Sequence, residues 1–153
     1  MLNIKNLSIS FLQNKKIEAC VHDVSFSLYQ NEILGMVGES GSGKSITSLA
    51  LLGLLPKGIA KVDGAIFYNE ENINTYSEKA FQKIRGRKIA MIFQEPMSSL
   101  NPTLTCGYQV AEILQQHTQF SKSEIYAAVI SLFEKVKLPR ASSIFKAYPH
   151  QIS

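Results

Sequence analysis

The feature that most constrains this chain is the stretch from Gly38 to Ser45, which reads Gly-Glu-Ser-Gly-Ser-Gly-Lys-Ser. It fills every position of the pattern Gly-x-x-x-x-Gly-Lys-[Ser/Thr]. The apolar run 32–37 before it is short enough for a buried strand, and residues 46–52 after it can continue as a helix. Between a strand and a helix, such a glycine loop binds phosphate, because its backbone N–H groups and the first helical turn converge on an anion.

The residue types in this loop each suit a task. Lys44 would place a point charge between the β- and γ-phosphates of a nucleotide, and the Ser45 hydroxyl would supply one ligand to Mg²⁺. A flexible Gly/Ser turn that happens to contain a lysine is the alternative, but the filled pattern and its flanks favour the phosphate site. The nucleotide-binding residues expected from the pattern are Gly38, Glu39, Ser40, Gly41, Ser42, Gly43, Lys44 and Ser45.

Composition narrows the class of protein. With 153 residues, of which 45% are apolar and 18% charged, the chain is expected to form one soluble globular domain. We expect no signal peptide, and the most apolar stretch, 49–55, is far below the ~20 residues of a membrane-spanning helix. Membrane association would therefore need a partner. Cys20 and Cys106 lack metal-ligand spacing, and the basic run 85–88 favours a solvated face over a nucleic-acid site.

Hydrophobic patterns divide the remaining chain into strands and helices. Antiparallel strands are predicted over 2–11, with a bulge near Asn6, and over 17–28 and 61–68. A second buried strand for a parallel core is predicted over 89–93. Helices are predicted from Lys44 to near Gly53, over 77–85, around 108–114, and from a capping box at Ser121 and Glu124 until Pro139 ends the last one.

Gln94 is the second candidate site residue. It follows the predicted strand 89–93, and the carboxyl ends of parallel strands open onto the same crevice as a phosphate loop. Its amide is therefore placed to reach Mg²⁺ or an attacking water. The alternative is an ordinary surface glutamine after a strand.

Three stretches together, 37–45, 93–102 and 148–153, resemble the ATP-binding subunits of ABC transporters, and more narrowly the dipeptide/oligopeptide/nickel importer group. The resemblance covers residues 1–153. It implies an α/β fold of the P-loop NTPase type with three parts. These are an antiparallel β layer (1–33 and 59–75), a phosphate-loop core with an incomplete parallel sheet (34–58 and 76–100), and a helical subdomain (101–153).

The resemblance also implies roles and partners. Lys44 and Gln94 would be the catalytic groups, Ser45 and Gln94 would face Mg²⁺, and Phe11 would stack on the adenine of ATP, unless it is an ordinary strand phenylalanine. The implied partners are a second ATP-binding subunit in a head-to-tail dimer, membrane-spanning permease subunits and, through them, a solute-binding protein, with no nucleic acid. The implied location is the cytoplasmic face of the inner membrane, peripheral through the permease.

The chain also departs from the family pattern. Ile152 and Ser153 match the first two positions of the family's signature motif, while its glycines and an apolar strand ending in Asp-Glu do not occur in these residues. We therefore expect the full-length protein to hydrolyse ATP to power import of peptides or a related solute, and residues 1–153 alone to bind ATP with scarcely any hydrolysis. The alternatives are a non-hydrolysing nucleotide-binding fragment and a non-transport ABC ATPase, such as a phosphonate-breakdown component.

Overall fold

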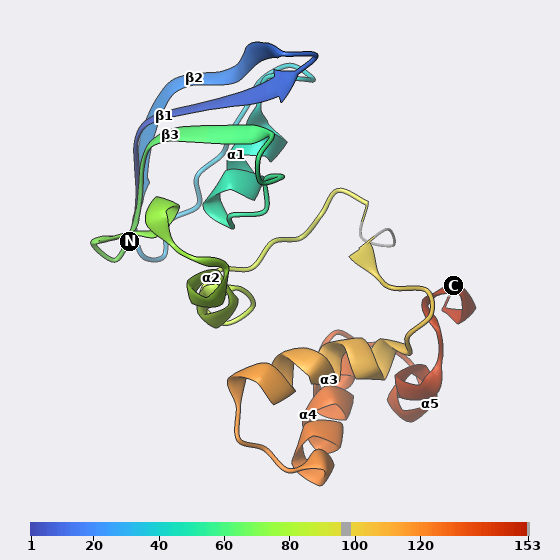
Figure 1. Cartoon of the computed structure of the whole chain (residues 1–153). Helices are drawn as coiled ribbons and strands as arrows, with labels where there is room; N and C mark the ends of the chain where they lie inside the picture. Colours follow the sequence, from blue (N-terminus) through green and yellow to red (C-terminus); the bar gives the residue numbers. More distant parts are fainter. Residues whose placement is uncertain (96–98, 153) are drawn as a thin grey trace. The chain divides into compact units, whose positions relative to one another are not determined.

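A computed structural model describes residues 1–95 and 99–152 of the chain. These residues form two compact units, Met1–Ala90 and Met91–Ser153, and each is described by itself (Figure 1). Pro96, Met97, Ser98 and Ser153, which belong to the motif stretches singled out in the sequence, lie outside the described residues. Among residues 1–95 and 99–152, no helix is long enough and apolar enough to span a membrane.

The first unit contains an antiparallel sheet with the strand order β2-β1-β3-β4. The strands are β1 (Leu2–Gln13), β2 (Lys16–Leu28), β3 (Ala60–Tyr68) and β4 (Glu71–Asn72). The two residues that join β1 to β2, Asn14 and Lys15, have φ values of 49° and 63°. Positive φ at both positions gives a turn whose twist matches that of the flanking strands. The three long strands predicted over 2–11, 17–28 and 61–68 are confirmed by β1, β2 and β3.

A bulge in β1 sets which side chains enter the core. The pairing with β2 shifts register between Ile4 and Leu7, and Asn6 has φ 50°. The Asn6 side chain donates to Asp23 Oδ1 at 2.7 Å, which stabilises the irregular pairing. Because one residue is inserted, Ile4, Leu7 and Ile9 are all buried although their spacing breaks strict alternation. The bulge predicted near Asn6 is confirmed.

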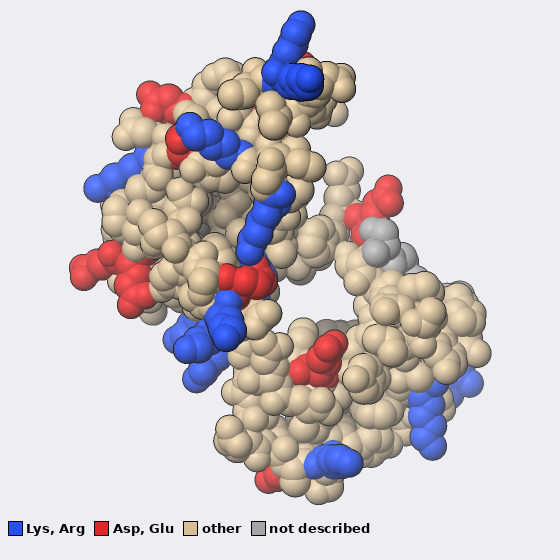
Figure 2. All heavy atoms as spheres, in the orientation of Figure 1, with Lys and Arg blue, Asp and Glu red and all other residues tan. Residues whose placement is uncertain are grey.

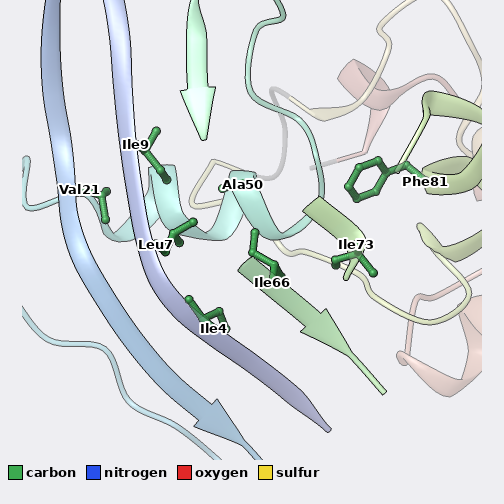
Figure 3. Packing of buried hydrophobic residues seen from close by; sticks show 8 residues of the cluster. All are labelled: Ile4, Leu7, Ile9, Val21, Ala50, Ile66, Ile73 and Phe81. Atoms are coloured by element: carbon green, nitrogen blue, oxygen red, sulfur yellow. The ribbon is translucent and has the colours of Figure 1, made fainter. Parts of the chain in front are cut away.

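The core of the first unit lies between the sheet and α1 (Lys44–Leu51). It is extended by the short helix η1 (Ile73–Thr75) and by α2 (Glu78–Ile84). Figure 3 shows the buried side chains gathered between these elements: Ile4, Leu7, Ile9, Val21, Ala50, Ile66, Ile73 and Phe81. The glycine loop 38–45 therefore leads directly into a helix that is packed against the sheet.

The second unit is helical. It contains α3 (Cys106–His117), α4 (Lys122–Lys135), α5 (Ala141–Lys146) and η3 (Pro149–Gln151). The predicted capping box is confirmed, since Ser121 Oγ accepts from the Glu124 backbone and the Glu124 carboxylate accepts from the Ser121 backbone. The predicted end of this helix before Pro139 is confirmed, since α4 ends at Lys135 with Val136 as its C-cap residue. Lys137, with φ 59°, turns the chain away between the helix and Pro139.

The two strands predicted at 32–37 and 89–93 are also wrong. Neither segment is a strand, and the exposed fractions of Ile33, Val37 and Ile92 are 98%, 99% and 92%. A strand exists only where a neighbour accepts its ladder of hydrogen bonds. Among the described residues, the single parallel pairing that touches either segment is an isolated bridge between Arg85 and Ile89. The apolar pattern indicated residues suited to burial, but burial also requires a covering partner.

Candidate functional site

The glycine loop turns directly into the first helix. Gly43 is the N-cap residue of α1, with φ 87° and ψ 0°, and its carbonyl accepts from Thr47 N at 2.8 Å. Within the loop, Ser42 N donates to Glu39 O at 3.2 Å. Helix α1 has no acidic residue in its first turn. Its positive dipole end and unpaired N–H groups are therefore not neutralised by a carboxylate of the same turn.

The side chain of Lys44 folds back over this loop. Its ammonium group donates to Gly38 O at 2.8 Å, to Glu39 O at 2.6 Å and to Ser42 Oγ at 3.0 Å. These contacts use the three donors of the ammonium group and close a ring over the loop. The structure thus gathers Gly38, Glu39, Ser42 and Lys44 around one positive charge. An anion would bind to Lys44 by replacing these loop oxygens as the acceptors of its ammonium group.

The remaining predicted loop residues differ in exposure. Ser40, Gly41 and Ser45 are exposed, Lys44 is half-buried and Gly43 is buried. Exposure of the loop leaves room for a ligand outside it. The Ser45 hydroxyl, at the second residue of α1, is a suitable oxygen ligand for a hard divalent cation such as Mg²⁺.

The end of the loop rests against β2, a support that the sequence did not reveal. A Cβ atom on Gly43 would lie 2.7 Å from Val21 Cγ2 and 3.0 Å from the carbonyl oxygen of Cys20. Only a glycine allows this approach of loop and strand. The apolar pattern of the sequence placed Val21 on the inward face of its strand, but it did not indicate that the loop would lie against this residue.

A hollow of about 320 Å³ lies on the inner side of the loop. Its polar lining comes from Gly38, Ser42, Lys44 and Thr47, and the rest of its lining comes from β2 and residues 34–37. The hydrogen bonds of the Lys44 ammonium group lie in an exposed part of the loop.

The predicted adenine-stacking residue, Phe11, lies in β1 opposite Glu18 and Ala60. Its ring is half-buried and packs against the core of the first unit. The ring therefore has both a core contact and an accessible part. This position is compatible with stacking on a base and with an ordinary structural role.

Gln94 belongs to the second unit and is exposed. The loop 38–45 and Phe11 belong to the first unit. Within residues 1–95 and 99–152, no cluster of three or more His, Cys, Asp or Glu side chains could hold a metal ion.

Arg85 supports the other end of α1 and was missed by sequence reasoning. Its Nε donates to Leu52 O at 2.7 Å and its Nη2 to Gly53 O at 2.9 Å, at the C-terminal end of the helix. The guanidinium also pairs with Glu78 and lies 4.9 Å from the Phe81 ring centroid. The hydrogen bond from Arg85 holds the pKa of the Glu78 carboxyl below its usual value. The basic run 85–88 was interpreted as a solvated face, which is wrong for Arg85, because its side chain is only 21% exposed.

A family model and three relatives of this chain indicate the same family. The family model described as ABC transporter matches residues 21–153. The oligopeptide transport ATP-binding protein AppD of Bacillus subtilis is 41% identical over 154 residues, covering 100% of this chain and 47% of its own length. The dipeptide transport ATP-binding protein DppD of Bacillus subtilis is 44% identical, covering 100% of this chain and 46% of its own length. The oligopeptide transport ATP-binding protein OppD of Escherichia coli is 40% identical, covering 100% and 45%.

The chain thus spans about half the length of the curated relatives it matches. Among solved structures, the dimeric structure of MJ0796, described as a bacterial ABC transporter cassette, has a TM-score of 0.82 at 25% identity. The match covers 100% of this chain and 63% of that one. The α/β fold of the ABC ATPase type predicted from the sequence is confirmed.

Proposed function

The chain belongs to the ABC transporter family, as the sequence resemblance indicated, and from this premise we propose that its loop 38–45 binds ATP. In the whole protein, hydrolysis of that ATP powers the import of peptides or a related small solute. The observation that carries the proposal is the position of the Lys44 ammonium group over the loop at the N-terminus of α1. This charge, the unpaired N–H groups of the first helical turn and the helix dipole together suit a chain of phosphates.

Each candidate residue has a proposed role in this function. Backbone N–H groups of the loop bind the phosphates, and Lys44 turns from the carbonyls of its own loop to the β- and γ-phosphate oxygens. Ser45 and Gln94 are the proposed ligands of Mg²⁺, which would neutralise charge on the phosphates when bound. Gln94 also orients the attacking water. Phe11 stacks on the adenine.

The proposed partners follow from the names of the relatives. AppD, DppD and OppD are each described as a transport ATP-binding protein, and the MJ0796 cassette is described as dimeric. We propose a head-to-tail dimer with a second ATP-binding subunit, attached to membrane-spanning permease subunits that receive solute from a binding protein. The protein then works at the cytoplasmic face of the inner membrane.

A nucleotide-binding module that does not hydrolyse ATP is the second candidate. It would bind ATP through the same loop 38–45, and phosphate release by the whole protein distinguishes the two candidates. Both candidates therefore require the same nucleotide site.

Nucleotide titration of Lys44→Ala tests that site. We expect the dissociation constant of Mg-ATP to rise at least tenfold, which corresponds to about 1.4 kcal/mol. Lys16→Ala is the matched control, because it removes an exposed lysine from the start of β2 without touching the loop. Equal affinities for Lys44→Ala and Lys16→Ala would contradict the assignment.

A further inference from the structure

A group of basic side chains covers one face of α2 and the turn after it. Residues 79–88 contain five Lys and Arg residues and no acidic residue. Lys79 and Lys83 lie one helical turn apart on α2. Arg87 and Lys88 follow in a turn that folds back on the helix, since their N–H groups donate to Ile84 O at 3.3 and 2.8 Å. We call Lys79, Lys83, Arg87 and Lys88 the basic face. Figure 2 shows basic side chains gathered where Figure 1 places α2.

The charges of the basic face are not neutralised locally. All four residues are exposed. Across residues 1–95 and 99–152, none of the four side chains has an ion pair, a hydrogen-bonded partner or an aromatic ring against it. The nearby acid, Glu78, instead pairs with Arg85 and Lys57. Arg85 is thus used within the fold, while its four neighbours point to solvent.

We propose that the basic face docks this protein on a surface of anionic phospholipid headgroups. The inference rests on the proposed function, which locates the protein at a membrane. A lipid surface requires only several outward positive charges on one face, and that is what α2 and its turn present. The one aromatic residue within 79–88, Phe81, is buried, so the face offers no ring on which a nucleic-acid base could stack. The exposed residues of the face carry no large apolar side chain, so the attachment is electrostatic and involves no insertion into the bilayer.

The expected strength follows from the number of charges. Each Lys or Arg near an anionic leaflet strengthens binding about fivefold. Removing two charges therefore weakens vesicle binding by about 25-fold. Because the attraction acts through solvent, about 0.5 M salt should abolish it, as the screening distance then falls to only a few ångströms.

The experiment measures co-sedimentation of the whole chain with vesicles of phosphatidylcholine, with and without phosphatidylglycerol. Lys79→Gln/Lys83→Gln and Arg87→Gln/Lys88→Gln are the test variants. Lys15→Gln/Lys16→Gln is the matched control, since it removes the same charge from exposed positions at the β1–β2 turn. Circular dichroism verifies that each variant is folded.

We expect binding only to vesicles that contain phosphatidylglycerol, about 25-fold weaker binding for each test variant, and much less change for the control. Equal losses in test and control variants would overturn the inference in favour of a net-charge effect. Binding to phosphatidylcholine alone, no binding to anionic vesicles, or tighter binding to a polyribonucleotide at equal phosphate concentration would also overturn it. Mg-ATP titration of the same variants separates the two proposals, since unchanged affinity with lost vesicle binding retains the nucleotide site.

Discussion

Replacement of Gly43 by alanine tests whether contact with β2 holds the phosphate loop in place. The added methyl group would lie 2.7 Å from Val21 Cγ2 and 3.0 Å from Cys20 O, on a backbone with φ 87°. A left-handed backbone costs alanine roughly 1–2 kcal/mol. Forcing a methyl group into occupied space costs about 1–3 kcal/mol more. We therefore expect Gly43→Ala to lower the free energy of unfolding by about 2–5 kcal/mol.

Gly41→Ala is the matched control for this substitution. Gly41 lies in the same loop with φ 83°, but a Cβ atom there would have no neighbour within 4 Å. It carries the backbone cost alone, about 1–2 kcal/mol. The difference between the two variants, about 1–3 kcal/mol, therefore measures the contact of loop and strand. In a double-mutant cycle, Gly43→Ala should cost less in the Val21→Ala background than in the unmodified chain, because Val21→Ala removes the closest atom and leaves Cys20 O.

Urea denaturation followed by far-UV circular dichroism at 25 °C measures these free energies. Mg-ATP titration of the folded variants then reports whether the displaced loop still binds nucleotide, and we expect weaker binding for Gly43→Ala than for Gly41→Ala. Equal losses of stability and of affinity in the two variants would refute the reasoning. They would show that only the left-handed backbone matters at Gly43.

Two further predictions concern Phe11 and the capping box. Phe11→Ala should weaken Mg-ATP binding while Phe11→Trp should not, since stacking on a base contributes roughly 1–3 kcal/mol; a lower melting temperature with unchanged affinity would assign Phe11 to the core alone. The pKa of Glu124 is lowered by hydrogen bonds from the Ser121 side chain and backbone. Its stabilising effect is therefore complete above the ordinary value of 4.5 and is lost as the pH falls below it. Glu124→Gln, which retains a capping oxygen, should lose less stability than the unmodified chain between pH 7 and pH 3 in urea titrations, and an identical loss would contradict this reading.

The elements that could be predicted from the sequence are those determined by near neighbours. The capping box at Ser121 and Glu124 is a contact between residues three positions apart, and the start of α1 at Lys44 follows from the contiguous glycine pattern before it. The bulge at Asn6 left a visible break in the alternation of Leu2 to Phe11. In each case the residues that reveal the feature are close in sequence, so their spacing carries the information.

The features that could not be predicted depend on distant partners. Arg85 bonds to carbonyl groups of Leu52 and Gly53, more than thirty positions earlier, and the composition of its neighbourhood pointed to solvent instead. The support of Gly43 by Cys20 and Val21 is likewise a contact across the first unit. The segments 32–37 and 89–93 were wrongly predicted as strands for the same reason. Apolar residues alone do not specify which strand will pair with them.

The difference between near and distant partners in the sequence also applies to ATP binding and ATP hydrolysis. All the atoms that bind the Lys44 ammonium group come from residues 38–42, so the ring over the loop forms although the strand predicted before it, over 32–37, does not. Gln94, in contrast, belongs to the other unit. Phosphoryl transfer depends on groups held in position around the γ-phosphate at the transition state. Affinity for ATP therefore tests a local structure that the loop supplies by itself, while hydrolysis tests the roles proposed for Gln94 and for the partners.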